Sequence, residues 1–352
     1  MPADAQLAAR EDWVIHWLDR RKDGVGALVA RAVAGATPGR DSTLAWLGVQ
    51  RQVRSFLRQA ATVPRDRSSE RVLAALDDHV AALSAAGARA HVAVATADPA
   101  TLVDARSRFG IRVALIGKGG AGKTVISSTL SRLLARRGRN VVAVDLDVNP
   151  GLAISLGLPA TDAGLPPEAI EEAPSAPYGW QLTTGLSPEE AVARFATVAP
   201  DGVRYLGLGK IGSADKEVAR RSVAAVRQIL LGLGAPDWDV VADLEAGPTT
   251  PFENYHDFSD HVVMVIGPAW RSAMTARRLL PMVGDRRLTI VYNRFRDEPD
   301  HPGLPPDLRI PFDADLTQAE REGRAPIDAC PGSAVVAAVG RLADLVVAAQ
   351  QR

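Results

Sequence analysis

The sequence predicts an α/β fold in which a mostly parallel sheet is flanked by helices and preceded by a mainly helical N-terminal domain. From residue 111 onward, short apolar runs alternate with helical patterns, which is typical of a parallel sheet covered on both faces. Residues 1–110 contain mostly helical patterns. The chain has 352 residues, 47% apolar and 23% charged, enough to bury the cores of two globular units. We therefore expect two domains, residues 1–110 and residues 111–352.

The N-terminal domain is predicted as a succession of helices divided by glycine and proline signals. The expected helices are about 5–20, 25–34, 41–61 and 69–86, divided at Gly24, at residues 36–39 and at residues 63–64. A strand is expected at residues 91–95 and a short helix at residues 99–108.

Two features of this domain have both a structural and a functional interpretation. Trp13, Trp17 and Trp46 fall in helical patterns, where core packing is the usual role and a partner-binding groove the alternative. Residues 51–58 are basic and amphipathic, which favours a solvated helix face over a contact with DNA or a membrane. No motif here carries a chemical mechanism.

Six strands are expected in the second domain, each a short apolar run. They lie at residues 112–116, 141–145, 203–208, 239–244, 261–266 and 288–292. Gly138 should end the helix after the first strand. Ser187 is expected at the N-cap of a later helix, with Pro188 at its first position and Glu190 at its third. Residues 157–186 are interpreted as a long surface connection.

The segment between the first strand and its helix is the most informative motif. Residues 117–124 are Gly-Lys-Gly-Gly-Ala-Gly-Lys-Thr, in the strand–loop–helix context that a P-loop needs. The glycines let backbone N–H groups turn inward around a phosphate, and the helix N-terminus adds the positive end of its dipole. We expect Lys123 to reach the β- and γ-phosphates and Thr124 to place its hydroxyl on Mg²⁺.

A second lysine in the loop, Lys118, makes the motif more specific. Only five of the 41 basic residues are lysines, and two of the five lie in this loop. The loop resembles the deviant P-loop of the MinD/ParA/nitrogenase iron protein group of dimeric ATPases, which implies a P-loop NTPase fold. In that family the extra lysine reaches across a dimer interface to the other subunit's nucleotide. The resemblance implies this role for Lys118, and a homodimer with ATP at its interface.

Carboxylates end two of the predicted strands, at the sheet edge where the P-loop should lie. Asp145 and Asp147 follow one apolar run and Asp243 follows another, a costly arrangement unless the carboxylates are paired or near a metal. The first segment resembles switch I of the same family, which implies that Asp147 orients the hydrolytic water and that Asp145 is structural. The second resembles Walker B and switch II. That resemblance implies that Asp243 holds Mg²⁺ through a water and that Gly247 senses the γ-phosphate.

Two later segments resemble the family's base pocket. Asn293 follows a predicted strand where the family's asparagine hydrogen-bonds adenine, and Pro311 lies in a segment similar to the late base-pocket loop. The residues expected around ATP or ADP are Gly117, Gly119, Gly120, Ala121, Gly122, Lys123, Thr124, Val125, Gly247, Asn293 and Pro311. The expected catalytic residues are Lys118, Lys123 and Asp147, and the expected Mg²⁺ site is formed by Thr124 and, through water, Asp243.

The Asp-Leu-Glu-Ala-Gly segment at residues 243–247 narrows the resemblance to the CooC-type ATPases, which mature carbon monoxide dehydrogenase by helping nickel insertion. The similarity extends over roughly residues 111–345. Nickel-handling members carry a C-x-C motif, whereas Ser213 and Asp215 stand here where the cysteines are expected. Cys330 is the only cysteine. Because a serine and one carboxylate do not replace two soft thiolates, we do not expect nickel handling.

Charge and hydropathy narrow the functional classes. The formal net charge is zero, so no general basic field favours nucleic acid, although a local patch remains open. The sequence has no 18-residue apolar run and no apolar signal segment in its first 25 residues, so we expect a cytoplasmic protein without a membrane span.

We expect an ATP-dependent, dimerising regulatory or maturation ATPase that acts on a protein client, whose identity stays open. The alternative is a ParA/MinD-like positioning ATPase that binds DNA or a membrane surface in its ATP state. A third class is a nucleotide-binding scaffold without hydrolysis, against which Lys123, Thr124, Asp147 and Asp243 argue.

Overall fold

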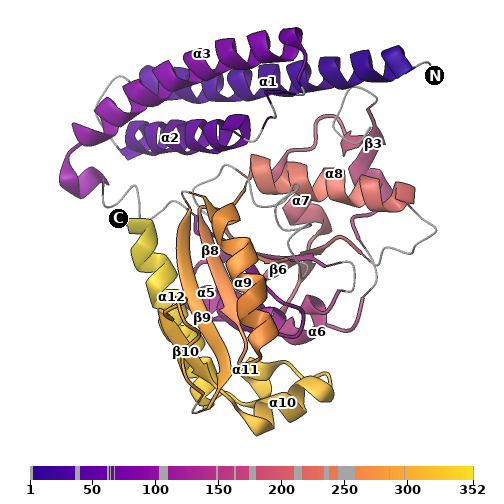
Figure 1. Ribbon diagram of the computed structural model, residues 1–352, viewed down its shortest axis with the longest axis vertical. Coiled ribbons are helices and arrows are strands. Elements are labelled where there is room, and N and C mark those ends of the chain that lie inside the picture. The colour runs from indigo at the N-terminus through magenta and orange to yellow at the C-terminus, as the bar shows by residue number, and fades with distance from the viewer. Residues whose placement is uncertain are drawn as a thin grey trace. The chain divides into compact units, whose positions relative to one another are not determined.

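The structure, a computed structural model, describes residues 3–351 except 36–39, 62, 64, 67, 103–109, 148–149, 162–163, 174–179, 210–215, 234–237, 245–257, 285 and 297. The chain separates into two compact units, whose elements are labelled in Figure 1. One comprises residues 1–109, 173–179 and 351, and the other comprises residues 110–172, 180–350 and 352.

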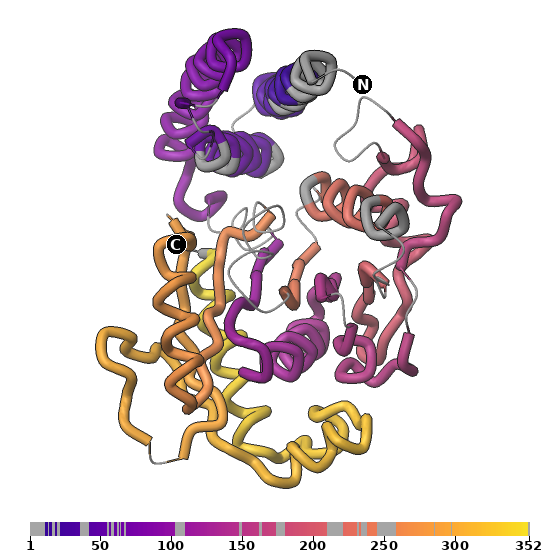
Figure 2. The backbone as a smooth tube through the Cα atoms, turned by 45° about the vertical axis from the view of Figure 1, so that its right-hand side comes forward, coloured from indigo at the N-terminus to yellow at the C-terminus, as the bar shows by residue number. Residues whose placement is uncertain are grey.

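Three helices form the first unit: α1 (Ala3–Ala34), α2 (Arg40–Ala61) and α3 (Glu70–Ala95). Each packs on the other two, and they lie side by side in Figures 1 and 2. Their common core contains Leu18, Phe56 and Leu76, none more than 1% exposed. Because the apolar faces of all three helices meet in this core, the bundle needs no strand to close it.

The first unit corrects two expectations. Gly24 does not divide a helix, because α1 runs through it without a break. A mid-helix glycine costs about 1 kcal/mol, and the burial of Leu18 and Val25 on either side offsets that cost. The strand expected at residues 91–95 is wrong, because α3 continues to Ala95.

The apolar spacing of α3 explains its length. Leu83, Ala86, Ala90 and Val94 recur at helical intervals and are all buried, so packing overrides the β-propensity of the Val-rich end. Ser69 caps the start of the helix by accepting the N–H of Val72 at 3.3 Å. Of the short helix expected next, residues 99–102 are helical and the remainder lies outside the described residues.

The side chains singled out in this unit are partly described. Trp46 packs at the edge of the helical core, which confirms the structural interpretation for that residue. The side chains of Trp13 and Trp17 lie outside the described residues. In the basic stretch, Val53 and Phe56 are buried and Arg54 is exposed, as expected for an amphipathic helix.

An eight-stranded sheet organises the second unit. Its strands are β1 (Arg112–Gly117), β2 (Asn140–Leu146), β5 (Thr197–Val198), β6 (Arg204–Gly207), β7 (Trp238–Leu244), β8 (His261–Ile266), β9 (Arg287–Phe295) and β10 (Leu308–Pro311). Their order is β10-β9-β8-β1-β7-β2-β6-β5, and all neighbours are parallel except β5 and β6. The six predicted strands are the six inner ones, so the predicted mostly parallel sheet is confirmed.

Helices cover both faces of this sheet. Along β1 the side chains alternate between two apolar clusters: Ala114 and Ile116 enter one, Val113 and Leu115 the other. The first cluster also receives α8 (Lys216–Gly232) and α9 (Trp270–Val283). The second receives α5 (Lys123–Arg136) and α12 (Ala334–Gln351). The helix α5, which follows the predicted P-loop, is therefore anchored by the apolar cluster on one face of the sheet.

Shorter elements complete the unit. They are α6 (Leu152–Leu156), η1 (Pro167–Ala169), β3 (Ile170–Glu172), β4 (Trp180–Leu182), α7 (Pro188–Phe195), η3 (Pro200–Gly202), α10 (Ala314–Arg321) and α11 (Pro326–Ala329). The capping box predicted at Ser187 and Glu190 is present. The surface connection predicted at residues 157–186 is wrong in part, because β3 and β4 pair there and bury Ile170 and Leu182.

Candidate functional site

The loop between β1 and α5 adopts a backbone that favours glycine. Gly117, Gly120 and Gly122 have φ angles of 146°, 77° and 91°. A Cβ atom on Gly117 would lie 2.3 Å from the carbonyl oxygen of Val265, its partner in β8. Glycine at this position therefore lets the two strands stay paired while the chain turns into the loop. The predicted sequence of strand, glycine loop and helix is present.

Asn293 lies directly against this loop. A Cβ atom on Gly122 would lie 2.2 Å from its amide nitrogen. That nitrogen donates to the carbonyl oxygen of Ala121 at 2.7 Å, and the side chain is 5% exposed. The asparagine thus braces the P-loop backbone across 172 residues of sequence, a contact that the sequence does not predict. Its expected contact with adenine stays a prediction.

The two lysines of the loop differ in environment. Lys123 begins α5 and is 7% exposed, and its ammonium donates to the carbonyl oxygen of Gly117 at 3.4 Å. Lys118 is half-buried, and its ammonium donates to the carbonyl oxygen of Gly119 at 3.3 Å. Lys123 therefore points back over the loop that should hold the phosphates, whereas Lys118 bonds to its neighbour at the loop's rim.

Thr124 and Asp243 form a polar pair at the start of α5. The Thr124 hydroxyl donates to Oδ2 of Asp243 at 2.5 Å. Oδ1 of Asp243 is buried and makes no hydrogen bond within the described part of the chain. The pKa of this carboxyl is raised to about 7, mainly because the group is buried. The hydrogen bond from Thr124 opposes the rise, and the nearby Asp145 carboxylate adds to it.

These two residues fit a Mg²⁺ ion. A hydroxyl and a carboxylate are hard oxygen donors, and Mg²⁺ is commonly bound by one or two such groups with waters and phosphates completing its shell. The buried Oδ1 of Asp243 would otherwise lack a partner, at a cost of a few kcal/mol. A water of the ion would supply that partner.

Asp145 organises the segment that follows β2. It is paired in register with Asp243 on the neighbouring strand β7 and is fully buried. Its carboxylate accepts the backbone N–H groups of Asp147 (3.1 Å), Gly151 (3.0 Å) and Leu152 (2.9 Å). Burial raises its pKa to about 6, against the lowering effect of these bonds. Asp145 thereby holds the backbone on both sides of residues 148–149, and Asp147 stands half-buried at the end of β2.

A pocket brings the predicted base-pocket residues together. Val125, Asn293 and Pro311 all line it, with Arg294 and Glu320. Arg294 has a φ angle of 63°, which is uncommon outside glycine, and its guanidinium pairs with Glu320 at 3.0 Å. A strained residue beside a predicted contact residue is a frequent feature of ligand sites. The sequence does not predict the ion pair between Arg294 and Glu320. Its one signal in the sequence is the Asn-Arg dipeptide near the end of β9.

Gly247, Ser213 and Asp215 lie outside the described residues. Among the described residues there is no gathering of three or more His, Cys, Asp or Glu side chains suited to a metal ion. No described helix is long and apolar enough to cross a membrane.

Comparison with known proteins identifies the region that carries this site. Residues 112–309 match the family described as the CobQ/CobB/MinD/ParA nucleotide binding domain. An uncharacterized ATP-binding protein of Methanocaldococcus jannaschii is 27% identical over 232 residues, covering 61% of this chain and 90% of the relative. The carbon monoxide dehydrogenase accessory protein CooC of Rhodospirillum rubrum is 28% identical over 240 residues, covering 63% and 91%.

Solved structures support the same fold. The septum site-determining protein MinD of Pyrococcus horikoshii, complexed with Mg-ADP, has a TM-score of 0.52 and 18% identity, covering 69% of this chain and 99% of that one. A ParA family ATPase of Chlorobium tepidum has a TM-score of 0.50 and 16% identity, covering 67% and 98%. At these identities the likeness concerns the fold alone, which is that of a P-loop NTPase.

Proposed function

The chain belongs to the family of CobQ/CobB/MinD/ParA nucleotide-binding domains, and on that premise we propose that it is a Mg²⁺-dependent ATPase that dimerises around ATP and switches a protein client. The hydrogen bond between Thr124 and Asp243 carries the proposal. It joins the hydroxyl that binds Mg²⁺ in a P-loop to a carboxylate at the end of a neighbouring strand. Thr124 stands in the first turn of the helix that follows the glycine loop, and Asp243 stands near the end of β7.

Each residue of the site has a distinct proposed role in phosphoryl transfer. Backbone N–H groups of the loop and the N-terminus of α5 bind the phosphates, and Lys123 neutralises part of their charge. Thr124 and, through water, Asp243 would hold Mg²⁺, and the bound ion would supply positive charge beside the transferring group. Asp147 accepts a hydrogen bond from the attacking water and orients it toward the γ-phosphate.

Lys118 is the residue proposed to act across a dimer. Its ammonium bonds to the Gly119 carbonyl at the rim of the loop, and it can exchange this acceptor for a phosphate oxygen of the second subunit's ATP. Such an exchange replaces a neutral carbonyl acceptor by a negatively charged phosphate oxygen, so the ammonium gains an ion pair in addition to the hydrogen bond. Dimerisation and phosphate recognition are then the same event.

The client is proposed to be a protein, recognised in part by residues 1–110. The relative from Rhodospirillum rubrum is named as an accessory protein of carbon monoxide dehydrogenase, so a client-directed role has a precedent among similar chains. The family match begins at β1, and the N-terminal helical unit lies before it. Ser213 and Asp215 replace the cysteines of nickel-handling members, so the proposed maturation or regulatory role does not include nickel transfer.

The site assignment is tested by calorimetric titration of Mg·ATP. We expect wild type to bind and Lys123→Ala to lose about 10- to 150-fold in affinity, since a charge-assisted contact to phosphate contributes roughly 1.5–3 kcal/mol. Asp147→Ala should bind ATP as wild type does and lose turnover. Equal affinity of wild type and Lys123→Ala would remove the basis of the proposal.

The alternative, a positioning ATPase of the ParA or MinD kind, predicts a different partner. In that case Asp147→Ala loaded with ATP should bind duplex DNA or anionic vesicles more tightly than the nucleotide-free protein does. The client-directed proposal predicts no such gain, and predicts capture of a specific protein that depends on residues 1–110.

A further inference from the structure

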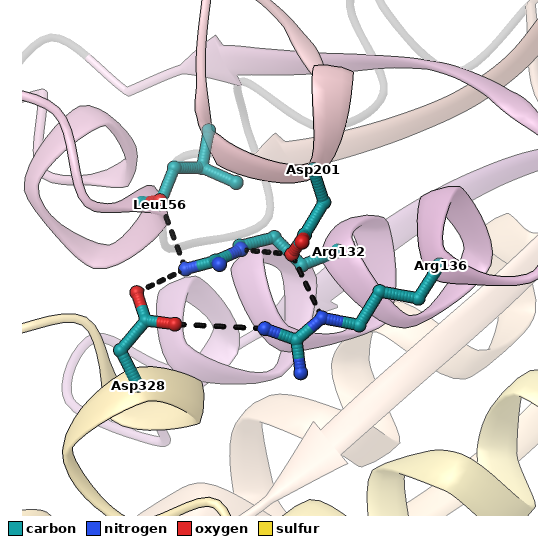
Figure 3. A network of polar contacts seen from close by, with 5 residues as sticks. All are labelled: Arg132, Arg136, Leu156, Asp201 and Asp328. Carbon is teal, nitrogen blue, oxygen red and sulfur yellow. Dashed lines mark hydrogen bonds and ion pairs between the residues drawn. The ribbon is translucent and has the colours of Figure 1, made fainter.

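A buried arginine of the P-loop helix contacts three other elements (Figure 3). Arg132 of α5 is 3% exposed. Its Nε donates to Asp201 of η3 at 2.7 Å, and its Nη1 pairs with Asp328 of α11. The same Nη1 donates to the carbonyl oxygen of Leu156, the last residue of α6, at 3.4 Å. One guanidinium thus joins the end of α6 to the helix that begins at the P-loop.

The helix α6 is held at both of its ends. Its first turn is fixed by the Asp145 carboxylate, which accepts the N–H groups of Gly151 and Leu152. Its last carbonyl, which like the others in the last turn has no partner within the helix, is bound by Arg132. A five-residue helix has little stability of its own. Its position is therefore set by these two side chains and by the buried residues between them.

The packing at the C-terminal end of α6 leaves little freedom. Gly157 caps the helix with a φ angle of 94°. A Cβ atom there would lie 3.3 Å from Pro200 and 3.6 Å from the Asp328 carboxylate. The end of α6 therefore meets η3 and α11 at the place where Arg132 binds both, so a shift of Arg132 displaces α6 as well.

We propose that Arg132 is a positioning residue for ATP hydrolysis: it fixes α6 against the P-loop helix and so fixes Asp147, which precedes α6 in the chain. The effect on turnover rests on the proposed ATPase function, but the effect on α6 does not. The planar guanidinium contacts two carboxylates and a carbonyl through two separate nitrogens, an arrangement that the single ammonium nitrogen of lysine does not reproduce. A misplacement of about 1 Å far from the reacting atoms can cost about 100-fold in rate.

Arg136 is the matched control. One turn further along α5, it contacts the same two carboxylates, Asp201 at 2.9 Å and Asp328 at 3.5 Å. It is about 40% exposed, and within the described residues it makes no hydrogen bond to α6. If the cluster were only a source of stability, the buried Arg132→Lys would cost more stability than Arg136→Lys, but kcat of the folded protein would be unchanged in both. If Arg132 positions α6, only Arg132→Lys should alter hydrolysis.

Two measurements on the full-length chain test the inference: amide hydrogen exchange of residues 152–157 without nucleotide, and steady-state ATP turnover. For Arg132→Lys we expect exchange at least about 10-fold faster and kcat about 10- to 100-fold lower, with KM for ATP within about twofold of wild type. Arg136→Lys should leave exchange, kcat and KM within about twofold. If Arg132→Lys does not fold, Asp328→Asn should give the same separation of kcat from KM.

Three results would overturn the inference: unchanged exchange in Arg132→Lys, faster exchange with unchanged kcat, or equal losses in Arg132→Lys and Arg136→Lys. A wild type that binds Mg·ATP and turns over none contradicts the proposed function instead. In that case the exchange difference between the two variants still decides whether Arg132 holds α6.

Discussion

At the scale of single residues, the site depends on a few backbone positions that tolerate no side chain. Gly122 combines a left-handed backbone with the amide of Asn293 2.2 Å from where its Cβ would lie. Gly138 has a similar φ angle of 80° but open space around its Cβ position. A side chain at either position would strain the backbone, but only a side chain at Gly122 would also collide with a residue of the site.

This contrast predicts how two alanine variants differ. Gly122→Ala and Gly138→Ala each incur about 1–2 kcal/mol of backbone strain. Only Gly122→Ala displaces Asn293 from the P-loop, so we expect its affinity for Mg·ATP to fall at least about 100-fold, a loss of roughly 2.7 kcal/mol. Gly138→Ala should bind within about twofold of wild type. Calorimetry on both variants checks this, and equal binding by the two would mean that Asn293 does not support the loop.

The buried carboxyl of Asp145 predicts a pH dependence of stability. Burial raises its pKa from 3.8 to about 6, so between these values the folded state keeps a proton that the unfolded chain releases. Stability therefore falls as pH rises through that window, by at most about 1.4 kcal/mol per pH unit. Asp145→Asn cannot titrate. Urea unfolding of the nucleotide-free protein between about pH 4 and 7 should show wild type losing stability relative to the variant, and a constant difference would contradict the assignment.

The residue types of the site are predictable from sequence, but the contacts between them are not. Lys123, Thr124 and the glycines carry their chemistry in one contiguous motif. Asn293 meets Ala121 from 172 residues away, and Arg132 meets Asp328 from 196 residues away. No local pattern marks such pairs, because they form only when the strands and helices that carry them are assembled.

At the scale of elements, burial decides what can be predicted. The six inner strands are continuous apolar runs because both faces of a parallel sheet are covered, and all six are predicted. The edge strand β5 has two residues and β10 ends in proline, so neither produces a run long enough to be recognised. The C-terminal part of α3 is predicted with the wrong secondary structure. Its valines suggest a strand, and only the packing of the bundle makes it helical.

The capping box of α7 allows an element-scale prediction. Ser187 accepts the N–H of Glu190 at 3.1 Å, and Glu190 accepts the N–H of Ser187 at 2.9 Å. Ser187→Ala removes the first bond, so we expect a loss of about 1 kcal/mol in the free energy of unfolding. Glu190→Gln keeps an acceptor and should lose less. Denaturant unfolding measures both, and a Ser187→Ala variant as stable as wild type would show that the cap contributes nothing.

At the scale of the whole molecule, the chain combines a nucleotide-binding unit with a helical unit that has its own core. The sheet unit contains both apolar clusters and every placed residue of the site, all after residue 110. We therefore predict that residues 111–352 fold alone and bind Mg·ATP within about threefold of the full chain, while turnover or client capture changes. An insoluble fragment would instead assign residues 1–110 the role of covering the sheet unit.

ATP binding and dimerisation are proposed to be one event, in which Lys118 of each subunit contacts the ATP of the other. Light scattering after size exclusion tests it on Asp147→Ala, which should hold ATP without turnover. With Mg·ATP the measured mass should double from the monomer value of 37.3 kDa, and with Mg·ADP it should not. Adding Lys118→Ala should abolish the doubling while calorimetry still detects ATP binding. A mass that stays monomeric with saturating Mg·ATP, or that doubles without Lys118, would contradict the account.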